Sequence, residues 1–414
     1  MSNSALLQGF LYASEASFCE VSSTFGTALN LIELVDLSGL GRSKTPVPTV
    51  KSYPFEGQQH VIEPFDGKSI RIKMPLTGLG ASAAGAVPSS DLVTFLGLLF
   101  GNAGNALATG GTLTGGTAAA PTTSMASGAA AGALVRAGAL GDARFGGQFV
   151  PVSAHSGSTL TLLLAGGAAP TNGDALFSGK VVYPTVLTGP GFEAITSLRC
   201  RILTSNGQYD LRGCFPLSAP VISGLNPGET PSIEVTLGVS HVATASTTFP
   251  SATQPQRHAP NPVVNGSFAI QQVGTTTRAT EALRKIAVDF GWSATAIKGP
   301  GGNYEGQIYQ AARRVPGVPT LDVTIDKEAT GTDTWWDRAA ADPNTAPYWQ
   351  AVYTASVQDG RAFAIGWKRL AIAESQPVQM NDDGWNRQRI KFEAQIGATK
   401  TTDLTAAPYV LAFA

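Results

Sequence analysis

Histidines and a pair of adjacent aspartates are the residues best suited to bind a metal ion. The chain contains four histidines, His60, His155, His241 and His258. Their spacings are unlike those of a local metal site, so we expect surface histidines or hydrogen-bonded core histidines, although distant histidines can meet in a fold. Asp382-Asp383 precedes Gly384. This pattern is more typical of a turn than of a calcium site, because calcium takes six or more oxygen ligands.

Thiol chemistry is the second possibility. The chain has three cysteines, an odd number, and no CxxC pattern, which argues against a disulfide scaffold or a zinc knuckle. Cys200 and Cys214 flank a predicted hairpin and could face each other across it. In a reducing cytoplasm we interpret the thiols as buried small hydrophobic groups rather than as nucleophiles or a disulfide.

A glycine-rich stretch, Gly78-Leu-Gly-Ala-Ser-Ala83, is similar to the loops that bind dinucleotides. Such a loop should follow a strand and open a long helix. Pro88 interrupts any helix here, and no βαβ pattern follows. The sequence also lacks a Walker A motif and a GxSxG motif. We therefore predict no catalytic, cofactor-binding or metal-ligating residue, no cofactor, and no enzyme activity.

Aromatic and basic side chains offer binding chemistry instead. The six tryptophans are Trp292, Trp335, Trp336, Trp349, Trp367 and Trp385. They could stack sugars or bases, but aromatic residues on alternate strand positions more often fill a core or an interface. We interpret the basic pairs Arg313-Arg314 and Lys368-Arg369 as solvated or ion-paired surface groups.

The elements that hold these residues are predicted to be strands. Hydrophobic residues make up 43% and charged residues only 14% of 414 residues, with 47 glycines and 26 prolines that punctuate the chain. The net charge of −1 excludes nucleic-acid binding driven by overall charge. No apolar run long enough to span a bilayer and no secretory signal pattern is visible, so we expect a protein made in the cytoplasm without membrane contact.

Short apolar runs between turn residues predict an all-β fold built from sandwiches or barrels. Asn206-Gly207 favours a hairpin between two of the runs, and Asp359-Gly360 favours a second hairpin over residues 352–367. One or two helical turns are expected over residues 334–341. The clearest predicted strands are Gly179–Val186, Leu198–Thr204, Tyr209–Cys214, Ile233–Val239, Ile286–Ile297, Thr320–Ile325, Tyr348–Val357, Arg361–Ile372 and Arg389–Ile396.

A polar, proline-rich stretch at residues 249–262 reads as an extended linker and predicts two domains, residues 1–260 and residues 261–414. Within the first domain, residues 79–147 form an insertion dominated by Gly, Ala, Thr and Ser. Side chains this small are expected to build no core. The insertion is interpreted either as flexible or as close-packed beneath another subunit. Ser89–Phe100 carries serine caps and helical spacing, which predict one short helix.

Four stretches of the chain resemble the tail tube proteins of long-tailed phages, particularly those with a large, two-domain subunit. They are Glu33–Gly41, Phe65–Gly78, Ser205–Pro216 with its Gly-Cys step, and Ala219–Leu237. The strands after residue 261 look like a second tube-type sandwich.

This resemblance implies two β-sandwich domains and a homo-oligomeric ring, either a trimer with pseudo-sixfold symmetry or a hexamer. Stacked rings would form a hollow tube in the virion tail, through which DNA passes non-specifically into the host. The implied partners are further copies, the tape measure protein, the terminator protein and the distal tail protein. The loop at residues 41–64, kept extended by its prolines, is a candidate arm for stacking on the next ring.

An alternative function stays open. The tryptophans on a β scaffold also fit a tail-tip or decoration module that binds host-surface glycans, with Trp335 and Trp336 as the residues to test. For a tube subunit, whose faces are buried against its neighbours, a low charge fraction is expected.

Overall fold

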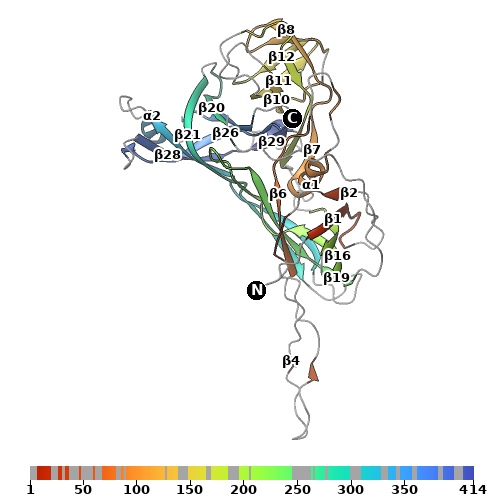
Figure 1. Ribbon diagram of the computed structural model, residues 1–414. Helices are drawn as coiled ribbons and strands as arrows, with labels where there is room; N and C mark the ends of the chain where they lie inside the picture. The colour runs from red at the N-terminus through yellow and green to blue at the C-terminus, as the bar shows by residue number, and fades with distance from the viewer. Residues whose placement is uncertain are drawn as a thin grey trace.

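The computed structural model of the 414-residue chain describes residues 7–19, 27–29, 33–36, 46–47, 59–60, 68–80, 85–87, 90–125, 128–138, 148–164, 169–184, 195–204, 207–244, 263, 266–275, 278–298, 309–327, 334–341, 346–356, 361–380, 386–395 and 404–414. Strands predominate among them and the helices are short, so the predicted all-β class is confirmed. Figure 1 shows a small barrel at the top, the ten-stranded sheet beneath it, and the nine-stranded sheet at the lower right.

The nine-stranded sheet comes from the first part of the chain. Its main path runs β2-β1-β15-β16-β18-β6-β3, with β17 paired to β18 and β19 paired to β16. Its strands are β1 (Leu7–Ser14), β2 (Thr27–Leu29), β3 (Glu33–Asp36), β6 (Lys68–Pro75), β15 (Leu198–Thr204), β16 (Gly207–Pro216), β17 (Val221–Ser223), β18 (Ser232–Val239) and β19 (His241–Thr244). β15 and β16 form the hairpin that the Asn-Gly sequence predicts.

The ten-stranded sheet draws strands from both sides of residue 260. It runs β27-β28-β24-β21-β20-β25-β26-β29-β14-β7. Its strands are β7 (Gly101–Leu107), β14 (Gly179–Pro184), β20 (Ser267–Gln272), β21 (Arg278–Asp289), β24 (Thr320–Lys327), β25 (Trp349–Ser356), β26 (Phe363–Ser375), β27 (Gln379–Met380), β28 (Asn386–Ala394) and β29 (Tyr409–Phe413). β25 and β26 form the second predicted hairpin. The boundary itself lies outside the described residues, and the two-domain division stays a prediction.

The closed barrel corrects one expectation about residues 79–147. Its strands are β8 (Gly111–Gly116), β9 (Pro121–Thr123), β10 (Leu134–Ala137), β11 (Phe149–Ser156), β12 (Thr159–Leu162) and β13 (Ala175–Phe177). Leu113 and Val135 from the insertion pack with Val150, Leu160 and Leu176 in a separate hydrophobic cluster. The expectation that this segment builds no core is therefore wrong, because apolar residues that are sparse along the chain converge when the barrel closes.

Two smaller strand pairs complete the β structure. β22 (Trp292–Lys298) pairs with β23 (Tyr309–Pro316), and β4 (Pro46–Val47) pairs with β5 (Gln59–His60). The single strand predicted over residues 286–297 is wrong, because the chain turns between β21 and β22. The turn is closed by a hydrogen bond from the Gly291 N–H to the Asp289 carboxylate (2.8 Å).

The predicted helix is confirmed as α1 (Asp91–Phe100), and the Ser90 side chain caps it by accepting a hydrogen bond from the Val93 N–H (3.3 Å). α1 joins the two large sheets. Phe95 packs on Tyr12 of β1, and Phe100 packs on Tyr409 of β29, with ring centroids 5.1 and 6.2 Å apart.

The remaining helical segments are α2 (Thr334–Ala339), at the predicted helical turns, and the 3-10 turn η3 (Leu404–Ala406). None of the described helices has the length and apolar character to cross a bilayer.

Candidate functional site

The described histidines do not converge. His155 of β11 accepts a hydrogen bond at Nδ1 from the Ala129 N–H (3.0 Å), and its Nε2 lies 3.4 Å from the Thr123 hydroxyl. No group of three metal-ligating side chains occurs among the described residues. The other candidates are His60 in β5, His241 in β19, and His258 and Asp382-Asp383, which lie outside the described residues.

All three thiols are buried and free, as predicted: Cys19, Cys200 and Cys214. The Glu15 carboxylate lies close to Cys19 and accepts hydrogen bonds from the Ser197 hydroxyl (2.5 Å) and from the N–H groups of Cys19 (3.0 Å) and Gly213 (3.2 Å). Burial raises the pKa of Glu15 and raises the pKa of the Cys19 thiol to about 12. A thiol with this pKa is protonated at neutral pH, which disfavours nucleophilic chemistry at Cys19.

The Gly-Cys step of β16 has a steric cause. Gly213 has a φ of +58°, and a Cβ placed on it would lie 2.6 Å from the Ser240 Cβ and 3.1 Å from the Cys19 Cβ. Only glycine fits this position. Another residue would be strained at this positive φ, and its Cβ would clash with Ser240 and crowd Cys19. The step therefore organises the core of the nine-stranded sheet.

Three arginines surround one carboxylate on the same sheet. Asp210 Oδ2 lies 2.6 Å from Arg199 Nη2, 3.5 Å from Arg201 Nη2 and 3.6 Å from Arg212 Nη2. Burial raises the pKa of Asp210, but the hydrogen bond and charge of Arg199 and the charges of Arg212 and Arg201 outweigh it, and the pKa falls below its ordinary value. This cluster stabilises the pairing of β15 with β16.

Of the five tryptophans that the structure describes, Trp335, Trp349 and Trp367 are buried in the core, and Trp385 lies outside the described residues. Trp335 is 2% exposed, and its ring centroid lies 4.9 Å from that of Trp349 and 5.8 Å from that of Phe392. Trp336 is 46% exposed. Trp335 is therefore covered by the protein itself, and of this pair only Trp336 offers an exposed ring for stacking on a sugar.

The interpretation of both basic pairs as surface groups is wrong for one member of each pair. Arg314 is 6% exposed; its guanidinium donates to the Leu99 carbonyl at the end of α1 (2.8 Å) and lies over the Trp292 ring. Lys368 on β26 lines a pocket. In β23, Arg313 and Arg314 point to opposite faces, as consecutive residues of a regular strand do, so Arg314 points inward.

The outward face of the β22–β23 hairpin carries an exposed apolar residue toward each end, with the exposed pair Thr295 and Arg313 between them. The inward face packs Tyr309 and Ala312 with Phe215 of the nine-stranded sheet. Ile297 and Val315 lie on the opposite face and are 47% and 43% exposed. Val318, just after β23, is 53% exposed. We name Ile297, Val315 and Val318, together with Thr295 and Arg313 between the first two, the hairpin patch; its apolar members are three of the seven large hydrophobic residues that are exposed in the described part of the chain.

β7 is an edge strand without the usual protection against pairing. It ends the ten-stranded sheet, and its sequence, GNAGNAL, contains no charged residue and no proline. Natural edge strands commonly carry such residues to prevent pairing with another chain. Ala129 and Ala130 pair with the end of its outer edge at Leu107 and Ala106, so the part of β7 before Ala106 is the part that offers an edge to a further strand.

The β4–β5 pair lies far from the sheets. Figure 1 shows β4 well below the rest of the ribbon. The two strands pair only with each other, Pro46 with His60 and Val47 with Gln59. The rest of the predicted arm at residues 41–64 lies outside the described residues.

Comparison with known proteins adds no identification. No protein-family model matches the chain, and no curated protein is significantly similar to its sequence. Among the described residues, the hairpin patch, the edge of β7 and the β4–β5 pair offer surfaces for contacts with other proteins.

Proposed function

We propose that the chain is the structural subunit of a phage tail tube and assembles through copies of itself into stacked rings. The hollow tube would conduct DNA during ejection. Support comes from the resemblance of four sequence stretches, from the all-β fold, and from a charged fraction of only 14%. No reactive constellation among the described residues favours an enzyme.

The observation that carries the proposal is the hairpin patch. Its large apolar side chains stand on a hairpin whose other face is anchored in the core, so the patch is held in place before any partner arrives. Burying such residues against a neighbour stabilises a contact by about 25 cal/mol per Å² of apolar surface. We assign this patch to the contact between neighbouring subunits of a ring, and the open edge of β7 to a second contact.

Negative-stain electron microscopy of the purified protein tests this function, with rings or hollow tubes as the expected result. The double substitution Ile297→Asp and Val315→Asp should abolish the rings, because two carboxylates would be buried in the contact. Val221→Asp is the matched control, since Val221 of β17 is 59% exposed and lies outside the patch.

Sedimentation velocity provides the second measurement. Wild-type protein and the Val221→Asp variant should sediment as large species, and the double variant should sediment as a folded monomer. A wild-type protein that stays monomeric at high concentration, alone and with tail-tip proteins, would contradict the proposal.

A further inference from the structure

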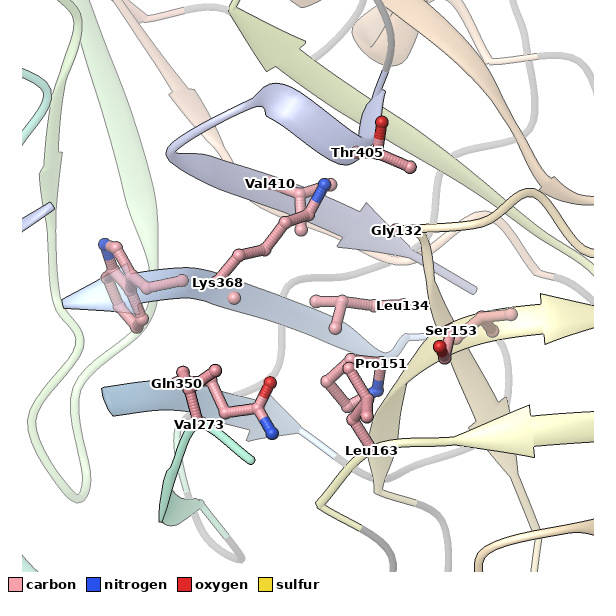
Figure 2. A pocket seen from close by; sticks show the side chains of 13 residues that line it. Gly132, Leu134, Pro151, Ser153, Leu163, Val273, Gln350, Lys368, Thr405 and Val410 are labelled. Carbon is pink, nitrogen blue, oxygen red and sulfur yellow. The ribbon is translucent and has the colours of Figure 1, made fainter. Parts of the chain in front are cut away.

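One pocket joins the barrel to the ten-stranded sheet. It has a volume of about 270 Å³. The barrel side contributes Leu134, Pro151 and Ser153, and the sheet contributes Gln350 and Lys368. Figure 2 shows the Lys368 side chain leaving β26 and reaching toward the segment that carries Thr405. We name this cavity the Lys368 pocket.

A β-bulge aims Lys368 into the pocket. Between the register pairs Trp349–Leu370 and Ala351–Trp367, β26 has two residues where β25 has only Gln350. Bulges of this kind redirect side chains and are frequent beside functional sites. Arg369, the other residue of the bulge, lies over the Tyr348 ring, 3.7 Å from its centroid. The bulge therefore separates two adjacent cations and leaves Lys368 alone in the cavity.

The ammonium group of Lys368 has no hydrogen-bond acceptor within reach in the described part of the protein. Its Nζ is shielded from solvent and has no hydrogen-bond partner there. A Cβ placed on Gly132, whose φ is +82°, would lie 2.6 Å from this Nζ, so the glycine leaves room beside the charge. Among the residues that line the pocket, Lys368 carries the only charge. Burial lowers the pKa of the Lys368 ammonium to about 7, which reflects this missing partner.

The residues that line the Lys368 pocket indicate the chemistry of a ligand that would pair with this ammonium group. Leu134, Val152 and Val410 are buried and apolar, and Leu163 and Val273 are 37% and 46% exposed. One lysine supplies one positive charge and cannot make the bidentate contacts by which arginine clusters hold phosphate. A single negative charge on an apolar body matches the pocket better. Its volume lies just below the range of about 300–1,000 Å³ for drug-sized ligands, which suits a short-chain group.

We propose that the Lys368 pocket binds a carboxylate that carries a short apolar body, with the carboxylate on Nζ and the apolar body against Leu163 and Val273. The hydroxyl groups of Ser153 and Thr405 and the Gln350 amide, which also line the pocket, offer further hydrogen bonds to the carboxylate. The carboxylate belongs either to a free acid or to an acidic side chain of a second copy of this chain. The site does not depend on the assembly proposed above.

Isothermal titration of the full chain with octanoate at pH 6 tests the site. Octanamide lacks the charge and butyrate lacks most of the apolar body, so both should bind at least tenfold more weakly. Lys368→Met keeps the apolar stem and should weaken octanoate binding at least tenfold. The matched control Lys285→Met removes an exposed lysine of β21 and should bind like wild type.

The pH dependence gives a readout that a purely structural lysine would not show. Above pH 7 the empty pocket holds a neutral amine, so octanoate binding must take up a proton. Its affinity should fall about tenfold from pH 7.5 to pH 8.5, with close to one proton taken up per ligand, measured in two buffers of different ionisation enthalpy. At pH 6 the uptake should nearly vanish.

Acetylation of Lys368, followed by mass spectrometry, separates the two sources. Protection that grows with protein concentration without octanoate assigns the carboxylate to a second copy; labelling that is constant with concentration but slowed by octanoate assigns it to a free acid. Two results would overturn the proposal. One is a folded wild-type protein that binds no octanoate at pH 6, and the other is a folded Lys368→Met variant that binds octanoate as tightly as wild type does.

Discussion

The Lys368 ammonium makes folding depend on pH in a direction that can be worked out. In the unfolded chain its pKa is near 10.5, and in the folded chain burial lowers the pKa to about 7. Between these values the unfolded chain binds a proton that the folded chain does not bind. The free energy of unfolding therefore rises with pH across this window, and below pH 7 the folded state carries the full penalty of the buried charge.

Lys368→Met should remove this penalty. Unfolding by urea should show a gain in stability at pH 6 of up to about 5 kcal/mol, which is the upper bound that the difference between the two pKa values allows. The gain should shrink toward zero near pH 10.5. Lys285→Met should change stability little at either pH, and a gain for Lys368→Met that is equal at pH 6 and pH 10 would contradict the assignment of the pKa.

The sequence indicated neither the burial of Lys368 nor that of Arg314. A pair of adjacent basic residues reads as polar, yet regular β-strand geometry sends Arg313 and Arg314 to opposite faces of β23. The β25–β26 bulge also depends on the pairing register, which only the assembled sheet defines. The buried thiols could be predicted, because a free cysteine packs as a small hydrophobic residue.

At the scale of elements, β3 and β6 make the arm removable. They are antiparallel neighbours, and Asp36 of β3 pairs with Arg71 of β6. The two strand ends therefore lie close together, and a short linker can join them without disturbing the nine-stranded sheet.

Replacing residues 41–64 with a short Gly-Ser linker should leave ring formation intact and prevent elongation into tubes, because this segment is the candidate arm for stacking on the next ring. Electron microscopy distinguishes single rings from tubes. Circular dichroism provides the control for folding. Tubes of normal length from the shortened chain would refute this role for the arm.

Local elements were largely predictable and their long-range pairing was not. The hairpins at 198–216 and 349–375 follow from Asn-Gly and Asp-Gly turns, and α1 follows from its serine cap and its spacing. No local sequence signal places β14, with β7 on its other side, next to β29, because β29 lies far along the chain from both. The barrel core was missed for the same reason.

At the scale of the whole molecule, the low charge predicts how assembly responds to salt. Charged residues are absent from positions 101–135 altogether and make up only 14% of the chain. Contacts between such surfaces gain little from ion pairs. The attraction between exposed charges is the part of a contact that salt weakens, since the screening length is about 10 Å at 0.1 M and shortens as salt is added.

The concentration at which rings form should therefore change by less than about threefold between 0.1 and 1 M sodium chloride, whereas contacts held by ion pairs would weaken strongly. Sedimentation velocity across this series provides the measurement. Dissociation of the rings at 1 M salt would show that charges, rather than the hairpin patch, hold the subunits together.

The place of β29 has a consequence for synthesis on the ribosome. β29 pairs with β26 on one side and β14 on the other, and β7 follows β14. β14 and β7 are translated early, yet Tyr409–Phe413, the neighbour of β14, is translated long after them. During that interval the edge of β14 that later pairs with β29 is unpaired, in a nascent chain that already contains apolar strands. Chaperones that shield open strand edges would thus have their greatest effect on this protein before translation reaches Phe413.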